Sequence, residues 1–381
     1  MLPRSFYISP LQSDLLDVFR WLAAFLVVIE HLRSLMFADY GTQGGMGVVG
    51  RIFYFLTGFG HSAVMVFFVM SGFLVGGKVL QRLAEGNFSW QKYGVDRFSR
   101  LYAVYLLALL LGGAFDYFGY HHFNQFGLYD QTFPGQIAVI NHNFHQNLST
   151  PVFAINLAMC QTILGPVFGS NGPLWSLANE FWYYLAAPIL FLLFCQKKIG
   201  VRALGAAALA GIVWFLPSSI LIYSVVWLLG AALYFFNERR LLPLWFSLGL
   251  FAACFSAARM QCISVPFVAD FLIAISFALV INSAAGFSRQ LVGKNLSRSL
   301  AGFSYSVYLC HFPFLALALS ILFQTGVIGF RGRPTLPLAA IFLAVLLAVY
   351  LWSYFISLGT ERQTPRIRAW LNRCFTRAGL D

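Results

Sequence analysis

The chain is built from long apolar runs separated by short polar stretches. Most runs reach or approach the roughly 17–25 residues that an α-helix needs to cross a bilayer. They predict ten membrane-spanning helices, near residues 14–37, 61–80, 101–115, 174–195, 203–217, 219–236, 243–258, 265–283, 300–323 and 335–357. The shorter runs favour tilted or interrupted helices. With no internal repeat or linker, the pattern predicts an all-α polytopic membrane protein in which residues 1–381 form one domain.

Composition supports this class and predicts an orientation. Charged residues make up 10% of the 381 residues, whereas soluble domains carry about 25%. Lys and Arg collect in cytoplasmic loops. With a cytoplasmic N-terminus, 20 of the 25 Lys and Arg residues lie inside, and the five outside are Arg33, Arg51, Arg259, Arg331 and Arg333. We therefore expect both termini in the cytoplasm, without a cleavable signal peptide.

Two classes of ligand are disfavoured. The net charge of +12 does not indicate nucleic acid, because the basic residues punctuate apolar runs instead of clustering on one soluble face. The six cysteines show neither a disulfide framework nor a metal spacing. The predicted extracytoplasmic loop, 116–173, contains four histidines, again without a known ligand spacing. We expect no metal there; its aromatic and polar residues favour an acceptor-binding surface, with residues 152–165 re-entrant or interfacial.

The first span carries the most informative polar pattern. Ionisable groups inside a span are costly, so each needs a partner, a wet cavity or a function. Arg20 and His31 are eleven residues apart, which places them on one helix face about 16 Å apart. Asp17 can pair with Arg20 at i,i+3. This arrangement suits a ligand that is anionic at one end and reactive at the other. Alternatively, Asp17 and Arg20 form an interface pair and His31 is a hydrogen-bonded core residue.

Polar and basic residues around the second span also allow two interpretations. Ser71 and Gly72 at its centre permit close backbone approach, which by itself indicates a small-residue helix contact. Lys92, Arg97 and Arg100 follow the span, with the two arginines one turn apart. Guanidinium groups suit phosphate recognition. Such basic clusters also obey the positive-inside rule or bind anionic lipid.

The later spans add a carboxylate, aromatic residues and a second histidine. Glu180 lies in the first turns of the fourth span, where it must be paired, solvated or functional. His311 lies about midway along the ninth span, and Glu361 follows the tenth at its inner end. The aromatic residues near Glu180 form either an interface belt or a stacking surface for a sugar; they include Trp175, Trp182 and Tyr183.

Five fragments of the chain carry a combined signal when they are taken in order. They are LDVFRWLAAFLVVIEH at 16–31, VFFVMSGFLV at 66–75, DRFSRLYAVY at 96–105, GPLWSLANEFWYYL at 172–185 and FSYSVYLCHFPF at 303–314. Together they resemble the acyltransferase-3 family of membrane O-acyltransferases, which modify bacterial cell-surface and secreted carbohydrates. The first fragment contains the R-x10-H motif of that family as Arg20 and His31. The resemblance covers essentially the whole chain, and we expect the membrane domain alone.

The resemblance implies an activity and roles for the residues above. A family member takes an acyl group, by default acetyl, from cytoplasmic acyl-CoA and delivers it to a hydroxyl of an extracytoplasmic carbohydrate or glycoconjugate at the bacterial inner membrane. His31 is then the general base or a transient acyl carrier, near neutral pH. The implied catalytic residues are His31, Glu180 and Ser71. The implied CoA-binding residues are Arg20, Asp17, Arg97, Arg100 and Lys92. The implied acceptor-binding residues are Trp175, Trp182, Tyr183 and His311.

Two other classes of protein stay open. A transporter of polysaccharide or lipid-linked sugar would share the ten spans, the intramembrane charges and the aromatic surfaces, although transporters often contain internal repeats. A lipid-binding structural or regulatory protein explains the basic loops but not Arg20, His31 and Glu180. Binding and turnover of acyl-CoA distinguish the acyltransferase from both.

Overall fold

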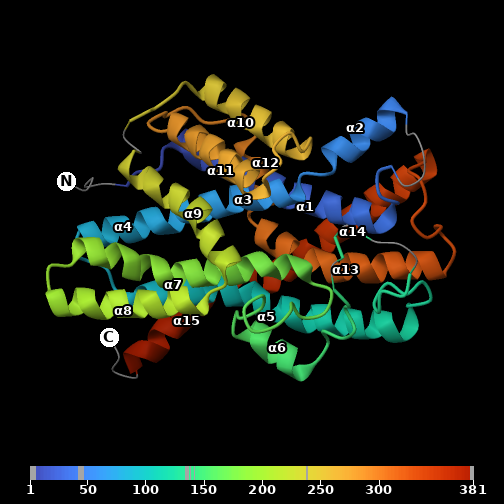
Figure 1. Ribbon diagram of the computed structural model, residues 1–381, viewed down its shortest axis with the longest axis horizontal. Helices are drawn as coiled ribbons and strands as arrows, with labels where there is room; N and C mark the ends of the chain where they lie inside the picture. Colours follow the sequence, from blue (N-terminus) through green and yellow to red (C-terminus); the bar gives the residue numbers. More distant parts are fainter. Residues whose placement is uncertain are drawn as a thin grey trace. The chain divides into compact units, whose positions relative to one another are not determined.

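The computed structural model describes residues 6–41, 47–133, 137, 139–140, 142–236 and 239–377, and these contain helices and connecting loops but no β-strand. Figure 1 shows the α-helices, which are α1 (Pro10–Met36), α2 (Val48–Leu56), α3 (Gly60–Ser71), α4 (Gly77–Ala84), α5 (Trp90–His122), α6 (Thr150–Leu157), α7 (Trp175–Cys195), α8 (Ile199–Phe215), α9 (Ser218–Ala232), α10 (Leu244–Arg259), α11 (Pro266–Ser283), α12 (Lys294–Ala301), α13 (Ser304–Gln324), α14 (Leu336–Gly359) and α15 (Thr364–Arg377). One π-helix, η1 (Gly72–Gly76), joins α3 to α4, and there are three short 3₁₀ segments, η2 (Gly172–Leu174), η3 (Leu233–Phe235) and η4 (Glu361–Gln363).

The helices account for the apolar pattern of the sequence. In the described part of the chain, seven helical segments are long and apolar enough to cross a membrane, and α8 and α10 are shorter apolar helices. The α1 helix, which is not one of these segments, has 27 residues and carries several charged side chains. The predicted all-α polytopic class is confirmed. The number of crossings and the side on which each terminus lies stay predictions.

The α5 helix is much longer than the apolar run that predicted it. The run covers residues 101–115, whereas the helix has 33 residues and extends past both ends of the run. An apolar run marks the part of a helix that avoids water, whereas the backbone hydrogen bonds continue through polar residues at each end. Lys92, Arg97 and Arg100 therefore lie on the helix itself, and α5 continues six residues beyond Asp116 to His122.

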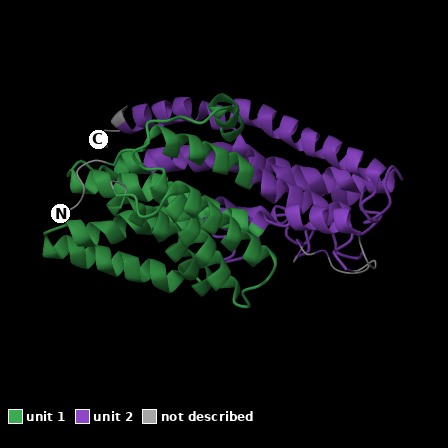
Figure 2. Cartoon of the chain, turned by 90° about the horizontal axis from the view of Figure 1, so that it is seen from above, with its two compact units in different colours: residues 1–23, 61–93, 179–301 green, residues 24–60, 94–178, 302–381 purple. Residues whose placement is uncertain are grey.

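The chain divides into two compact units, which Figure 2 colours separately. Unit 1 comprises residues 1–23, 61–93 and 179–301. Unit 2 comprises residues 24–60, 94–178 and 302–381. The helices α1, α5 and α7 each contribute residues to both units.

In unit 1, a π-helix packs tightly against α9. A Cβ atom added at Gly72 would overlap the carbonyl oxygen of Trp227, and one added at Gly230 would overlap the carbonyl oxygen of Val69. Glycine at both positions thus allows two helix backbones to touch. The small-residue helix contact predicted at Ser71 and Gly72 is confirmed, and it brings Ser71 to the indole of Trp227.

In unit 2, α13 packs along α14 and is interrupted by a proline. Pro313 has no N–H to donate to the carbonyl of Leu309 four residues earlier. The side-chain amide of Asn171 donates to that carbonyl instead, at 2.8 Å. At the preceding residue, the Tyr308 hydroxyl lies 2.8 Å from the hydroxyl of Ser176. These bonds anchor the turn of α13 that carries His311.

Candidate functional site

Two histidines meet in unit 2, one from α1 and one from α13. Nδ1 of His31 lies 2.8 Å from Nε2 of His311. The two ring planes differ by 5° and the ring centroids are 5.1 Å apart. That separation is close to the hydrogen-bond length plus the two ring radii, so the bond lies in line with both rings. The edge of Phe312 packs against the His31 ring at 5.1 Å.

The two histidines differ in exposure. His311 is fully buried, whereas His31 is half-buried. Nδ1 of His311 lies 3.0 Å from the carbonyl oxygen of Val307 and 2.8 Å from that of Tyr308, on its own helix. Both ring nitrogens of His311 thus have partners within the protein. The predicted acceptor-binding role of His311 stays a prediction.

A second polar cluster lies in unit 1 and joins two of the predicted catalytic residues. The Ser71 hydroxyl donates to Oε1 of Glu180 at 2.6 Å, and the Tyr184 hydroxyl donates to the same oxygen. The indole N–H of Trp227 donates to the Ser71 hydroxyl at 3.1 Å. Within the residues that the structure describes, no hydrogen bond reaches Oε2 of Glu180. One half of this half-buried carboxylate is therefore available to an incoming group.

The predicted aromatic surface has only part of its rings available. Tyr183 is buried, and its hydroxyl donates to the carbonyl of Ile220 at 2.7 Å. Trp182 is half-buried and packs against Phe215 with ring centroids 5.1 Å apart. Trp175 is half-buried at the first residue of α7. Tyr183 is thus enclosed while the two tryptophans keep partial exposure, and the predicted acceptor-binding role of all three stays a prediction.

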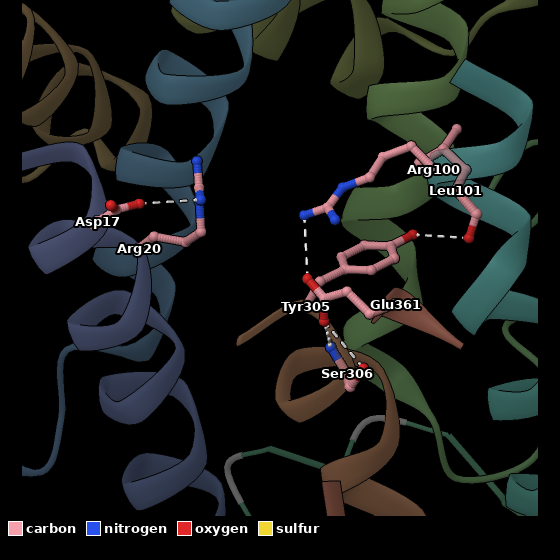
Figure 3. A network of polar contacts seen from close by, with 7 residues as sticks. All are labelled: Asp17, Arg20, Arg100, Leu101, Tyr305, Ser306 and Glu361. Carbon is pink, nitrogen blue, oxygen red and sulfur yellow. Dashed lines mark hydrogen bonds and ion pairs between the residues drawn. The ribbon is translucent and has the colours of Figure 1, made fainter. Parts of the chain in front are cut away.

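The predicted pairing at the start of α1 is confirmed (Figure 3). Nη1 of Arg20 lies 3.4 Å from Oδ1 of Asp17, at the expected i,i+3 spacing. Asp17 also lies 3.9 Å from Arg298 of α12. The Asp17 carboxylate thus interacts with both Arg20 and Arg298. The guanidinium of Arg20 remains partly exposed.

Farther along α1, Glu30 has a structural partner. Its carboxylate accepts the backbone N–H of Gly60, the first residue of α3, where a negative charge is favourable. Arg33 lies 3.9 Å from the same carboxylate. A side chain at position 60 would overlap the Glu30 carboxylate. These contacts explain two of the charged residues of α1 without a catalytic role.

The sequence did not reveal the partner of Arg100. Nη2 of Arg100 lies 3.2 Å from Oε1 of Glu361, which is almost completely buried, and the guanidinium lies over the ring of Tyr305 (Figure 3). The backbone N–H and the hydroxyl of Ser306 donate to Oε2 of Glu361, at 3.1 Å and 3.0 Å. In the sequence, Glu361 is recognisable as a carboxylate at the end of an apolar run. Its pairing with Arg100 could not be predicted, because Arg100 lies on a helix far away in the sequence.

The other predicted CoA-binding residues share α5. Arg97 is half-buried one turn before Arg100, as the spacing predicts, and Lys92 is exposed near the start of the helix. Asp96, beside Arg97, pairs with Arg368 of α15 at 3.1 Å. This end of α5 therefore carries a mixture of exposed and ion-paired cations.

The histidines of the 116–173 segment are engaged in packing. Nε2 of His142 donates to the carbonyl of Gly169 at 3.0 Å. Burial lowers the pKa of His142, and this hydrogen bond opposes the effect. His145 stacks on Tyr120 with centroids 3.6 Å apart. Across the described ranges, no three His, Cys, Asp or Glu side chains gather as metal ligands.

Comparison with known proteins gives the family. The acyltransferase domain family matches residues 14–358, nearly the whole chain. The chain belongs to the acyltransferase-3 family. The predicted resemblance is confirmed, and the long apolar helices of a member of this family indicate a multi-pass membrane protein.

Two curated relatives match parts of the chain. Acyltransferase MdmB of Streptomyces mycarofaciens is 28% identical over 201 residues, which are 52% of this chain and 44% of MdmB. An uncharacterized protein of Haemophilus influenzae is 30% identical over 141 residues, which are 36% of this chain and 52% of the relative. The chain spans about half the length of each relative. No solved structure matches it.

Proposed function

We propose that this acyltransferase moves an acyl group, acetyl by default, from cytoplasmic acyl-CoA to a hydroxyl of an extracytoplasmic carbohydrate or glycoconjugate. We place it in the inner membrane of a bacterium. One observation carries the proposal: the histidine of the R-x10-H motif, His31, is half-buried and forms a hydrogen bond with the fully buried His311. A base that is held by a second residue yet remains accessible suits transfer to a hydroxyl.

The acyl donor binds through its phosphates in this proposal. Arg20, which Asp17 holds, and Arg97, Arg100 and Lys92 on α5 supply the positive charge. Arg20 and His31 share α1 and are separated by eleven residues, about 16 Å along the helix axis. An extended pantetheine arm can span this length and carry the thioester toward His31.

The transfer itself needs one base and no metal. Nε2 of His31 accepts the proton of the acceptor hydroxyl while the hydroxyl oxygen attacks the thioester carbonyl carbon. The carbon–sulfur bond then breaks, and the CoA sulfur takes the proton back from His31. In the alternative route, Nε2 attacks the thioester first and the acyl group passes from His31 to the hydroxyl. Both routes convert acyl-CoA and an alcohol into an ester and CoA.

The acceptor is recognised by polar and aromatic groups. The available oxygen of Glu180, which Ser71 holds through the other oxygen, can accept a hydrogen bond from a sugar hydroxyl. The partly exposed rings of Trp175 and Trp182 offer apolar faces to a sugar ring.

Calorimetry with acetyl-CoA and the purified, detergent-solubilised protein tests the donor. We expect saturable binding that is weakened in Arg20→Ala and retained in His31→Ala. We also expect transfer of a radiolabelled acetyl group to bacterial envelope glycans by the wild type and none by a folded His31→Ala variant. Failure of the folded wild type to bind acetyl-, succinyl- and longer acyl-CoA would refute the proposal and favour a transporter. Full transfer by His31→Ala would remove His31 from the mechanism.

A further inference from the structure

The surroundings of His311 determine where its hydrogen lies. Its Nδ1 faces two carbonyl oxygens, of Val307 at 3.0 Å and of Tyr308 at 2.8 Å. A carbonyl oxygen only accepts hydrogen bonds, so Nδ1 of His311 must carry a hydrogen. In a neutral imidazole the other nitrogen then has none. Nε2 of His311 is therefore an acceptor.

The contact between the two rings then determines which nitrogen of His31 carries the hydrogen. A separation of 2.8 Å between Nε2 of His311 and Nδ1 of His31 requires one hydrogen between them. Because Nε2 of His311 has no hydrogen, Nδ1 of His31 is the donor. Nε2 of neutral His31 is then left with a lone pair. The nearly parallel planes and the 5.1 Å centroid separation place this hydrogen bond in the plane of both rings, where the lone pair points.

His31 is half-buried, and in the described part of the chain its Nε2 makes no hydrogen bond. The pair therefore has a buried end, at two backbone carbonyls, and an open end, at Nε2 of His31.

We propose that His311 is a positioning residue that holds His31 in the tautomer with hydrogen on Nδ1, so that Nε2 is the atom that takes the acceptor proton or the acyl group. This inference rests on the proposed function and adds the atom and its support. When Nε2 of His31 gains a proton, the hydrogen on Nδ1 can pass to Nε2 of His311. The positive charge is then shared between two rings, one of which is held by two carbonyl dipoles.

A neutral partner suits this place in the protein. In serine hydrolases a carboxylate orients the catalytic histidine, but a carboxylate that loses its partner in a low-dielectric interior is costly. His311 orients His31 without adding a net charge. Its own anchors are backbone atoms of α13, so the orientation does not depend on a further side chain.

Two variants at position 311 test the inference. Leucine removes the acceptor for Nδ1–H of His31, whereas the side-chain oxygen of glutamine can replace it. We expect His311→Leu to lower kcat for acetyl transfer by about a hundredfold or more, with the Kd for acetyl-CoA unchanged within about twofold. We expect His311→Gln to recover at least about a tenth of the wild-type kcat. His61→Gln, at a histidine of α3 that contacts Asp270 and lies outside the proposed sites, serves as the matched control and leaves kcat unchanged.

Nitrogen-15 NMR of histidine-labelled protein reads the tautomer directly. The resonances of His31 are assigned by their loss in His31→Gln. We expect a protonated Nδ1 and an unprotonated Nε2 in the wild type and in His311→Gln, and a shift toward the opposite tautomer in His311→Leu. If His311→Leu does not fold, the wild type and His311→Gln still decide the question.

The outcomes separate this inference from the proposed function. A wild-type His31 that carries its hydrogen on Nε2 overturns the inference, as does a folded His311→Leu with wild-type kcat. Absence of acetyl-CoA binding by the wild type overturns the proposed function instead, whatever tautomer NMR reports.

Discussion

Arg100 has two roles in this account, because it binds the CoA phosphates in the proposal and pairs with buried Glu361 in the structure. Changes at both positions separate the roles. The Glu361 side chain is 4% exposed and that of Arg100 is 37% exposed. Arg100→Ala removes the guanidinium beside a buried carboxylate, which still accepts the N–H and hydroxyl of Ser306. Glu361→Gln keeps the shape of the side chain and removes its negative charge, which competes with a CoA phosphate for Arg100.

The magnitudes follow from this asymmetry. Removing one partner of a buried ion pair costs about 3–5 kcal/mol. Water reaches the arginine side and screens the pair, so we expect about 2–3 kcal/mol for Arg100→Ala. Glu361→Gln weakens charge-assisted hydrogen bonds while Arg100 can turn to solvent, which should cost about 1–2 kcal/mol. In the double variant no unpaired charge remains, so it should be about 1 kcal/mol more stable than Arg100→Ala.

Two assays on the detergent-solubilised protein measure the two roles. Thermal unfolding followed by tryptophan fluorescence should order the proteins as wild type, Glu361→Gln, double variant and Arg100→Ala, from most to least stable. Calorimetry should show that acetyl-CoA binds about tenfold more weakly to Arg100→Ala and to the double variant, the equivalent of about 1.4 kcal/mol. Affinity should be unchanged or higher in Glu361→Gln.

The reasoning is refuted if the double variant is as unstable as Arg100→Ala, because the loss would then come from packing and not from the uncompensated carboxylate. It is also refuted if a folded Glu361→Gln loses affinity as strongly as Arg100→Ala. In that case Glu361 would set the binding position of the arginine instead of competing for it.

Three further changes have defined outcomes. Gly72→Ala should lower the yield of folded protein and the Tm sharply, because its methyl group overlaps a backbone carbonyl of α9; Gly249→Ala, where space is open, should be neutral or stabilising by up to about 1 kcal/mol. Arg20→Ala should weaken acetyl-CoA binding about tenfold, whereas Arg298→Ala, the other arginine near the same aspartate, should not; equal losses in calorimetry would contradict a specific phosphate contact. His142 is half-buried and its pKa is lowered, so below about pH 6.5 the unfolded chain binds a proton that the folded protein does not, and stability falls; thermal unfolding of His142→Gln should lack this part of the pH dependence, and identical pH profiles would contradict it.

Features that depend on local pattern were predictable from the chain. The apolar runs predict the helices and the membrane class because backbone hydrogen bonding in a bilayer leaves few alternatives to a helix. The Asp17–Arg20 pair follows from i,i+3 geometry within one helix. The family resemblance rests on short fragments whose order is itself a property of the sequence, and the match over residues 14–358 bears it out.

Local pattern does not indicate some features of the structure. The apolar run at 101–115 is shorter than α5, because polar residues extend the helix at both ends. Tyr183 is typical of an exposed aromatic belt in the sequence but is buried, with its hydroxyl on a backbone carbonyl. The π-helix at Gly72–Gly76 gives no local signal beyond its glycines, since it accompanies a backbone contact with Gly230 on another helix.

The pairings that carry the chemistry came from the three-dimensional arrangement. Helical periodicity tells which residues share one face, but not which face of another helix lies opposite. His31 and His311, Ser71 and Glu180, and Arg100 and Glu361 each join helices that are distant in the chain. The chain alone therefore specifies a helical membrane protein of the acyltransferase-3 family with a short set of polar candidates. Packing of α13 on α1 decides which nitrogen of His31 is left open, because hydrogen positions depend on partners in space.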